Sequence, residues 1–405
     1  MHQLSEIRDR AEISRDKKAA FGRDLNLEEF SRQGGAWEYD PEYRQFSPEE
    51  RSRLLTAGIE LTDEDHAGTF FQADKAIVHC QTRQPGVEVL PITEAVGRHD
   101  WVKNLLWGLV AVDADKYTAA AELDLDNGYF IRALPGAQIS QPVESCLYLR
   151  TDRFAQHIHN LVVVEEGASL HIITGCATHP GVISGLHVGV SEFYVKKGGK
   201  LTFTMVHNWG KEVHVRPRTA VMVEEGGTYI SNYILLRPVK SVQMYPTVTL
   251  NGAGAVARLQ SILIAHPGCE LDVGGRVILK APHTRAEVIA RTLALGGTSI
   301  ARGHLVGLVP DIKAHLECRG LILGTGVVYA IPELEGRVAG VDMSHEAAVG
   351  KIAAEEVEYL MARGLDEEEA VSTIVRGFLN VKIEGLPLAL EEEMEQAIQE
   401  SGKGL

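Results

Sequence analysis

The sequence predicts a mainly β protein whose centre is a parallel β-helix and whose two ends are helical. Short segments of β-forming residues recur from about residue 128 to residue 340, and glycine turns separate them. The turns begin at Gly167, Gly198, Gly226 and Gly252, a drifting repeat of roughly 25 to 30 residues. Repetition at this length, with no helices long enough for α/β crossovers, is typical of a β-solenoid.

The first region, residues 1–127, is charged and is predicted to be helical or mixed. Ser47, Pro48 and Glu50 form a helix start, with serine as the N-cap and proline at the first helical position. The run 100–107 predicts another short helix. We therefore expect this region to lie outside the repeat.

The central region, residues 128–343, is predicted to form the β-helix. Two charged residues and a glycine close successive strands, as in Glu165-Glu166-Gly167 and Lys196-Lys197-Gly198. A β-sandwich also contains short strands at regular spacing, and it stays open as the alternative. The same residue order at the same point of each unit favours the β-helix.

The last region, residues 344–405, is predicted to be a helical domain. Ser344 is a good N-cap, so we expect the first helix to begin there, and Gly364 and Asp366 predict the next boundary. Three apolar stripes follow: Val349, Ile352, Tyr359 and Leu360; then Val371, Ile374, Val375, Phe378 and Leu379; then Leu390, Met394 and Ile398. Whether they cap the solenoid or receive a partner stays open.

Composition excludes several classes of function. A net charge of −15 argues against a broad nucleic-acid surface, because phosphate contacts need clustered Lys and Arg. Five cysteines without a CxxC pair make a disulfide framework improbable. The polar beginning of the chain carries no export signal and no apolar run is long enough to span a membrane, so we expect a cytoplasmic protein. Nucleotide-binding and hydrolase motifs are missing, so we expect no ATP hydrolysis by this chain.

Cys318 is the first candidate for chemistry, because cysteine, histidine and glutamate together bind transition metals or act as nucleophiles. It follows His315-Leu316-Glu317 in an alternating strand pattern. We expect Cys318 to share the face of Leu316, and His315 and Glu317 to project in opposite directions. A buried core cysteine is the alternative.

His345 and Glu346 are the second candidate. At the first two positions of the predicted helix, the dipole favours the carboxylate and a neutral imidazole, a competent pair of metal ligands. The alternative is that Glu346 binds no metal and only interacts favourably with the positive end of the helix dipole. His157 and His159 share one face of a strand and could be a metal pair or simply line the solenoid, and Cys176 is expected to be structural.

Several segments resemble the SufB/SufD family of iron–sulfur cluster assembly proteins. The most specific is SHEAAVGKI at 344–352, which continues through YLMARG at 359–364 and EAVSTIVRGF at 369–378. The segments VVVEEGA at 162–168, VHNW at 206–209 and DKKAAFG at 16–22 also resemble the family. The resemblance extends over nearly the whole chain.

The resemblance implies a right-handed parallel β-helix flanked by helical regions, with a SufC-type ABC ATPase docked on the C-terminal helices. It implies a site at the junction of two protomers. Cys318 matches the cysteine that the SufB branch uses for the nascent cluster, Glu346 matches the carboxylate of that branch, and His345 matches a histidine of the SufD branch. Residues of both branches on one chain suggest a homodimer, although a SufB/SufD paralogue could be the partner.

The leading hypothesis is therefore an assembly scaffold rather than an enzyme. Cys318, Glu346 and His345 would bind the iron of a transient iron–sulfur cluster, with a cysteine desulfurase or other sulfur donor and cluster acceptor proteins as further partners. One alternative is a structural adaptor for the ATPase without a cluster of its own. Another is a β-helix enzyme acting on polysaccharide, which the scarcity of aromatic residues disfavours.

Overall fold

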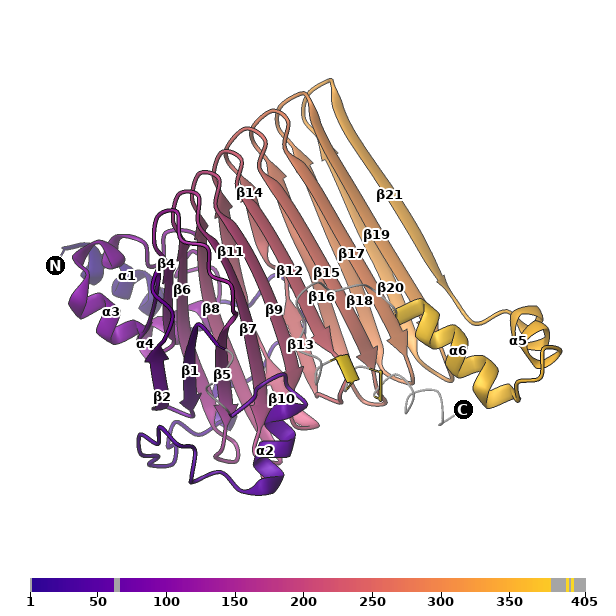
Figure 1. The fold of residues 1–405 in the computed structure, drawn as a ribbon, viewed down its shortest axis with the longest axis horizontal. Coiled ribbons are helices and arrows are strands. Elements are labelled where there is room, and N and C mark those ends of the chain that lie inside the picture. Colours follow the sequence, from indigo (N-terminus) through magenta and orange to yellow (C-terminus); the bar gives the residue numbers. More distant parts are fainter. Residues whose placement is uncertain (1, 62–65, 380–390, 393–394, 397–405) are drawn as a thin grey trace.

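The computed structural model describes residues 2–61, 66–379, 391–392 and 395–396. Two sheets run along the molecule and enclose a common apolar core, which confirms the predicted parallel β-helix (Figure 1). The N-terminal helices lie at one end of the sheets, and two C-terminal helices lie at the other (Figure 1). The helical flanks are therefore confirmed as well.

The first sheet contains ten strands. In spatial order they are β2 (Ala76–Thr82), β1 (Gly68–Ala73), β5 (Val143–Leu149), β7 (Ser169–Thr178), β9 (Lys200–Asn208), β12 (Thr228–Leu235), β15 (Val256–Ala265), β17 (Arg285–Ala294), β19 (Ile312–Ile322) and β21 (Val341–Gly350). From β1 onward the neighbouring strands pair in parallel.

The second sheet contains eleven strands. They are β10 (Glu212–Val215), β13 (Ser241–Met244), β16 (Glu270–Leu279), β14 (Thr247–Leu250), β11 (Arg218–Val223), β8 (Ser184–Val195), β6 (Ala155–Val164), β4 (Tyr129–Ala133), β3 (Val87–Pro91), β18 (Thr298–Gly307) and β20 (Val327–Gly336). β18 pairs with β16 and β20, so β20 ends this sheet as β21 ends the first.

The helices are short and lie outside the core. They are α1 (His2–Ile13), α2 (Pro48–Leu55), α3 (Ile92–Arg98), α4 (Lys116–Leu123), α5 (Ala354–Met361) and α6 (Glu367–Leu379), with 3₁₀ turns η1 (Leu27–Glu29) and η2 (Asp100–Asn104). The predicted start of α2 is confirmed, since the Ser47 side chain and Glu50 form a capping box. In the part of the chain that the structure describes, no helix is long and apolar enough to cross a membrane.

The glycine turns stack because each contains a residue in the left-handed conformation. Gly198 has φ 63° and donates its N–H to the Glu225 carbonyl at 2.8 Å, and Gly226 has φ 63° and donates to Ala253 at 2.9 Å. Further along, His283 (φ 62°) and Asp311 (φ 59°) occupy the same conformation. The repeat therefore continues beyond the point where glycine marks it.

The strands extend beyond both limits predicted for the central region. β1 lies upstream of residue 128 and pairs in parallel with β5. β21 pairs with β19 through to Gly350, so the prediction of a helix beginning at Ser344 is wrong. The first helix after it, α5, begins at Ala354. Ser344 is locally suited to a cap, but the strand ladder with β19 satisfies the backbone of this segment instead.

α6 covers part of the outer face of the first sheet. Val375 and Leu379 pack on a cluster that includes Ile234, Ile262 and Leu293 from β12, β15 and β17. The predicted helix boundary is confirmed: Gly364 has φ 100°, and Asp366 accepts a hydrogen bond from the Glu369 N–H at 2.8 Å. The predicted third stripe, Leu390, Met394 and Ile398, lies outside the described residues.

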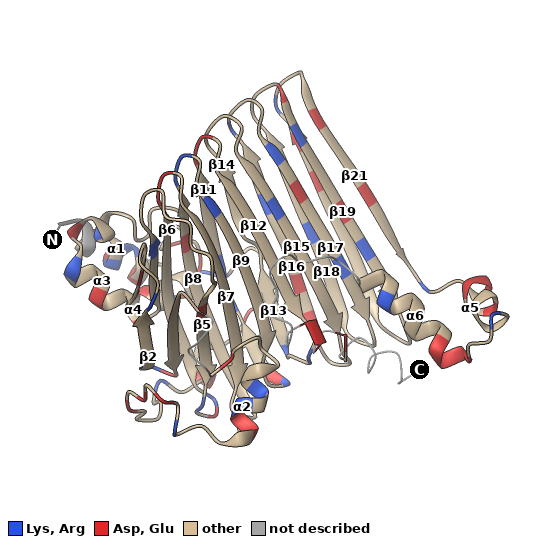
Figure 2. Ribbon diagram, viewed as in Figure 1, with Lys and Arg blue, Asp and Glu red and all other residues tan. Residues whose placement is uncertain are grey.

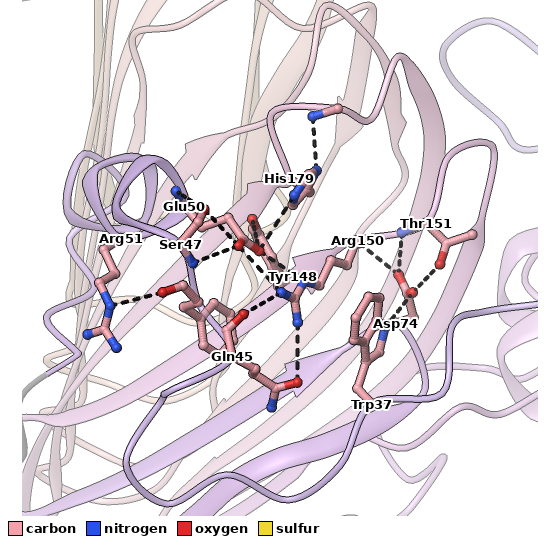
Figure 3. A network of polar contacts seen from close by, with 12 residues as sticks. Trp37, Gln45, Ser47, Glu50, Arg51, Asp74, Tyr148, Arg150, Thr151 and His179 are labelled. Carbon is pink, nitrogen blue, oxygen red and sulfur yellow. Dashed lines mark hydrogen bonds and ion pairs between the residues drawn. The ribbon is translucent and has the colours of Figure 1, made fainter.

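A polar network fastens the segment around α2 to the first coils (Figure 3). The buried Asp74 carboxylate accepts hydrogen bonds from the indole of Trp37 at 3.1 Å and the Thr151 hydroxyl at 2.6 Å. Glu50 pairs with the Arg150 guanidinium at 2.9 Å, and that guanidinium stacks 4.0 Å from the Trp37 ring. The N-terminal region therefore covers the early strands, and the last coils lie at the far end of the molecule (Figure 1).

Candidate metal centre

The candidate residues lie on β19 and β21, at the open end of the β-helix. Among the described residues, β21 is hydrogen-bonded to β19 alone and β20 to β18 alone. The other edge of each strand therefore presents backbone groups that can pair with another chain. In the part of the chain that the structure describes, no further coil covers the side chains of this last coil.

Cys318 lies on the inner face of the first sheet. It is in register with Ala290 on β17 and Ala347 on β21, and it is only 1% exposed. Burial, and then the neighbouring Glu317 charge, raises the pKa of the Cys318 thiol to about 11. In the isolated protomer the thiol is therefore neutral near pH 7, and a ligating thiolate requires an incoming cation or a change in its surroundings.

His345 lies on the same inner face. It is in register with Leu316, which is fully buried, whereas His345 itself is exposed because β21 is the last strand. Ala347, the partner of Cys318, is two residues further along β21. The fold thus places the His345 imidazole and the Cys318 thiol on the same face of adjacent strands. They are offset by two residues along the strand, which is the spacing of neighbouring side chains on one face.

Glu346 lies on the opposite, outer face. It is in register with Glu317, and its carboxylate, the Glu317 carboxylate and the His315 ring offer ligand atoms within 4.8 Å of one another. The structure therefore brings Glu346 together with His315 and Glu317, and it separates Glu346 from Cys318 by the sheet.

Arginines occupy this outer cluster. Arg319 donates a hydrogen bond to Glu346 at 2.8 Å and forms an ion pair with Glu317 at 3.1 Å, and Arg291 pairs with Glu317 at 2.7 Å. The His315 Nδ1 atom lies 2.9 Å from the Ser344 hydroxyl. A cation that binds both carboxylates must therefore displace Arg319.

The outer cluster was missed by sequence reasoning. The expectation that His315 and Glu317 project in opposite directions is wrong, because residues two apart on a strand share a face. That spacing, His315-Leu316-Glu317, was the available signal. The expectation that Cys318 shares the face of Leu316 is confirmed.

The other candidates lie elsewhere. His157 and His159 are both buried on the outer face of β6, where His159 contacts Glu192 at 2.8 Å. Burial lowers the pKa of His157, and neither histidine belongs to a group of three metal-ligating side chains among the described residues. Cys176 is buried, which raises the pKa of its thiol.

The charged residues of the last strands form ion pairs across the outer face. Figure 2 shows Lys, Arg, Asp and Glu distributed along β15, β17, β19 and β21. Arg258 on β15 pairs with Glu287 on β17 at 3.2 Å, which is the same kind of cross-strand contact as that of Arg319 with Glu346. The outer cluster is thus the end of a row of surface ion pairs.

Comparison with protein families gives one match, over residues 147–378. The family is described as "SUF system FeS cluster assembly, SufBD core domain". The matched residues include the strands from β6 to β21 and both C-terminal helices up to Phe378.

Curated relatives are similar over most of the chain. A SufBD family iron–sulfur cluster assembly protein of Methanothermobacter thermautotrophicus is 46% identical over 403 residues, covering 98% of each chain. One from Archaeoglobus fulgidus is 49% identical over 357 residues, covering 88% of this chain and 96% of the relative. The iron–sulfur cluster assembly protein SufB of Bacillus subtilis is 29% identical, covering 76% of this chain and 65% of that protein.

Proposed function

Because the chain belongs to the SufBD family of iron–sulfur cluster assembly proteins, we propose that it serves as a scaffold on which a nascent cluster is built at the open end of its β-helix. The cluster is cargo that the scaffold must release. Cys318 and His345 of one protomer are its first ligands.

One observation carries this proposal: Cys318 and His345 lie on the same inner face of the last two strands of the sheet. A single thiolate with an imidazole holds iron less firmly than four thiolates would, because nitrogen is a harder ligand than sulfur. Weak ligation suits a protein that passes its cluster to acceptor proteins.

Glu346 enters the proposal differently. Since it lies on the outer face, it reaches the cluster only from a second protomer or after β21 shifts. Until then, Glu346 is available to iron only in competition with Arg319.

A second copy of the chain is proposed to close the site. Among the described residues β20 and β21 each have one unpaired edge, and the apolar side chains of Tyr329, Leu334 and Val349 on these strands are 55%, 42% and 42% exposed. Unpaired strand edges with exposed apolar side chains favour association with another sheet. A homodimer joined here brings two Cys318 residues to one junction.

The C-terminal helices are the proposed contact for a SufC-type ATPase. A groove lined by Tyr359, Leu360 and Ile374 lies between α5 and α6, with Glu355 and Glu356 at its side. Tyr359 is 58% exposed, so an aromatic anchor is available to a partner. ATP-driven closure of that partner would shift the protomers, and a sulfur donor such as a cysteine desulfurase would supply sulfide.

Anaerobic reconstitution with iron and sulfide tests the scaffold. We expect visible absorption and a Mössbauer signal from a bound cluster in the wild type, and loss or rapid decay of both in Cys318→Ala. Cys269→Ala is the matched control, because Cys269 is also buried but lies away from the open end. Equal clusters in all three proteins would refute ligation by Cys318.

The second candidate function is a structural adaptor for the ATPase without its own cluster. The pairing of Arg291 with Glu317 and of Arg319 with Glu346 favours it, because both outer carboxylates are then neutralised within the protomer. An adaptor would bind the ATPase normally and reconstitute no cluster, even with that ATPase and nucleotide present.

A further inference from the structure

A separate cavity of about 330 Å³ lies on the outer face of the second sheet. Its wall is formed by residues of β13, β16 and β18, by Arg216 after β10, and by the N-terminal segment at Gly22 and Arg23. The neighbouring Phe21 stacks 4.3 Å from the guanidinium of Arg302, which holds this segment against the sheet. The cavity is large enough for several waters or a small metabolite.

Arg216 is a buried cation in the wall of this cavity. It is 1% exposed, and its hydrogen bonds go to the backbone carbonyls of Val215 at 2.9 Å, Ser241 at 3.4 Å and Arg23 at 3.3 Å, while its guanidinium lies 5.8 Å from the centre of the Tyr117 ring. Its Nε atom is buried without a partner, and within the described part of the chain it forms no ion pair. Burial lowers the pKa of Arg216, which reflects the cost of holding its charge away from water, and the nearby Tyr117 and Glu270 offset this only in part.

The other charges that line the cavity balance one another. Arg302 pairs with Asp272 at 2.6 Å, and Arg23 lies 3.7 Å from Glu270. Arg216 therefore has no ion pair of its own among the described residues, and the charged residues of the lining sum to one net positive charge.

A second orphaned group belongs to another residue of the cavity wall. Gln243, which is 5% exposed, has a side-chain oxygen that is buried without a hydrogen-bond partner. The N-terminal segment contacts this residue closely, since a Cβ on Gly22 would lie 2.4 Å from the Gln243 Cγ atom. An unsatisfied donor and an unsatisfied acceptor thus line one cavity, each at a free-energy cost that a bound polar ligand removes.

We propose that this cavity binds a small oxyanion, the phosphate or carboxylate group of a small metabolite, with Arg216 as its counter-ion. The oxyanion accepts hydrogen bonds from the guanidinium, and a hydroxyl on the ligand donates to the Gln243 oxygen. The site lies on the other sheet from Cys318, and it is independent of the proposed scaffold function.

Calorimetric titration of the full chain with inorganic phosphate, and separately with acetate, tests the site at constant ionic strength. We expect saturable binding of at least one probe near one equivalent, and the probe that binds identifies the source of the anion. Thr298 is half-buried and lines the cavity, so Thr298→Phe adds a ring there while Arg216 itself stays unchanged. This variant should weaken binding at least tenfold.

Two controls make the result decisive. Thr247→Phe adds the same ring to the outer face of the same sheet, outside the cavity, and should bind like the wild type. Arg216→Gln should abolish binding, whereas Arg218→Gln should not, because Arg218 is already paired with Asp115. Saturation by neither probe, or equal binding by wild type and Thr298→Phe, would overturn the proposal.

Discussion

Cys318 is a neutral thiol in the isolated protomer near pH 7, and it should therefore react slowly with alkylating reagents. With a pKa of about 11 rather than 9.0, its thiolate fraction at pH 8 is about one hundredth of that of an ordinary cysteine. We therefore predict that iodoacetamide modifies Cys318 about 100-fold more slowly than free glutathione, and that the rate rises with pH up to about 11. Quantitative mass spectrometry of the modified peptide measures this rate. A rate that levels off near pH 8 would contradict it.

Arg319 pairs with both outer carboxylates, Glu317 and Glu346, and therefore competes with any cation that binds them. We predict that Arg319→Gln tightens the binding of Mn²⁺ about tenfold, because removing one positive charge beside Glu317 and Glu346 strengthens their attraction for the ion. Its effect on the free energy of unfolding should stay below about 1 kcal/mol, as for other exposed ion pairs. Electron paramagnetic resonance of free Mn²⁺ gives the affinity.

The matched control is Arg258→Gln, which breaks the similar outer ion pair with Glu287. No histidine joins that pair in a group of three ligands among the described residues, so its loss should leave Mn²⁺ binding unchanged. An equal gain in both variants would mean that Mn²⁺ responds only to net charge.

The candidate site was predictable in its residues but not in its geometry. The resemblance pointed to Cys318, His345 and Glu346, yet the faces they occupy depend on the register between β19 and β21. Register is a tertiary property, and a shift of one residue would exchange the two faces. His315 and Glu317 enter only when that register is known.

The turns of the solenoid were predictable where glycine marks them. Left-handed positions are easy to recognise in Gly198 and Gly226, but His283 and Asp311 carry the same conformation without that signal. The error at Ser344 has a related cause: a serine N-cap is a local preference, whereas the ladder with β19 is formed by residues distant in sequence.

Substitution by alanine should have opposite effects on stability at a glycine in a stacked turn and at a glycine inside a helix. A Cβ at Gly226 or at Gly377 would meet nothing within 4 Å, so packing is unaffected at both positions. Gly226 is left-handed, and Gly226→Ala should destabilise the protein by about 1 kcal/mol or somewhat more. Gly377 lies inside α6, and Gly377→Ala should stabilise it by about 0.5–1 kcal/mol. Urea unfolding curves compare the two, and the same sign for both would contradict the account.

At the scale of the whole molecule, one end of the β-helix is covered and the other is open. The N-terminal segment that Asp74 and Arg150 hold in place covers the early strands, whereas no described residue pairs with the outer edges of β20 and β21. The family and the fold were predictable from the repeat, the turns and the resemblance, whereas the open end was not, because β21 forms a strand where a helix was expected.

We predict that the open end mediates self-association. Leu334 lies on the inner face of β20, in register with the buried Leu305, and is 42% exposed at the open end. Leu334→Lys should raise the dissociation constant of the dimer at least tenfold, because it places a charge in the apolar junction. Ile183→Lys is the control, since Ile183 is 71% exposed but precedes β8, away from the last coil. Sedimentation velocity over a concentration series measures the equilibrium. A wild type that remains monomeric throughout, or an equal shift in both variants, would contradict the homodimer.

The most direct test of the account is pulsed electron paramagnetic resonance of the reduced, reconstituted cluster in protein labelled with ¹⁵N-histidine. We expect a nitrogen coupling in the wild type that disappears in His345→Ala and persists in His315→Ala, because of these two histidines only His345 shares the inner face with Cys318. A coupling that persists in His345→Ala and disappears in His315→Ala would place the cluster on the outer face and contradict the central claim.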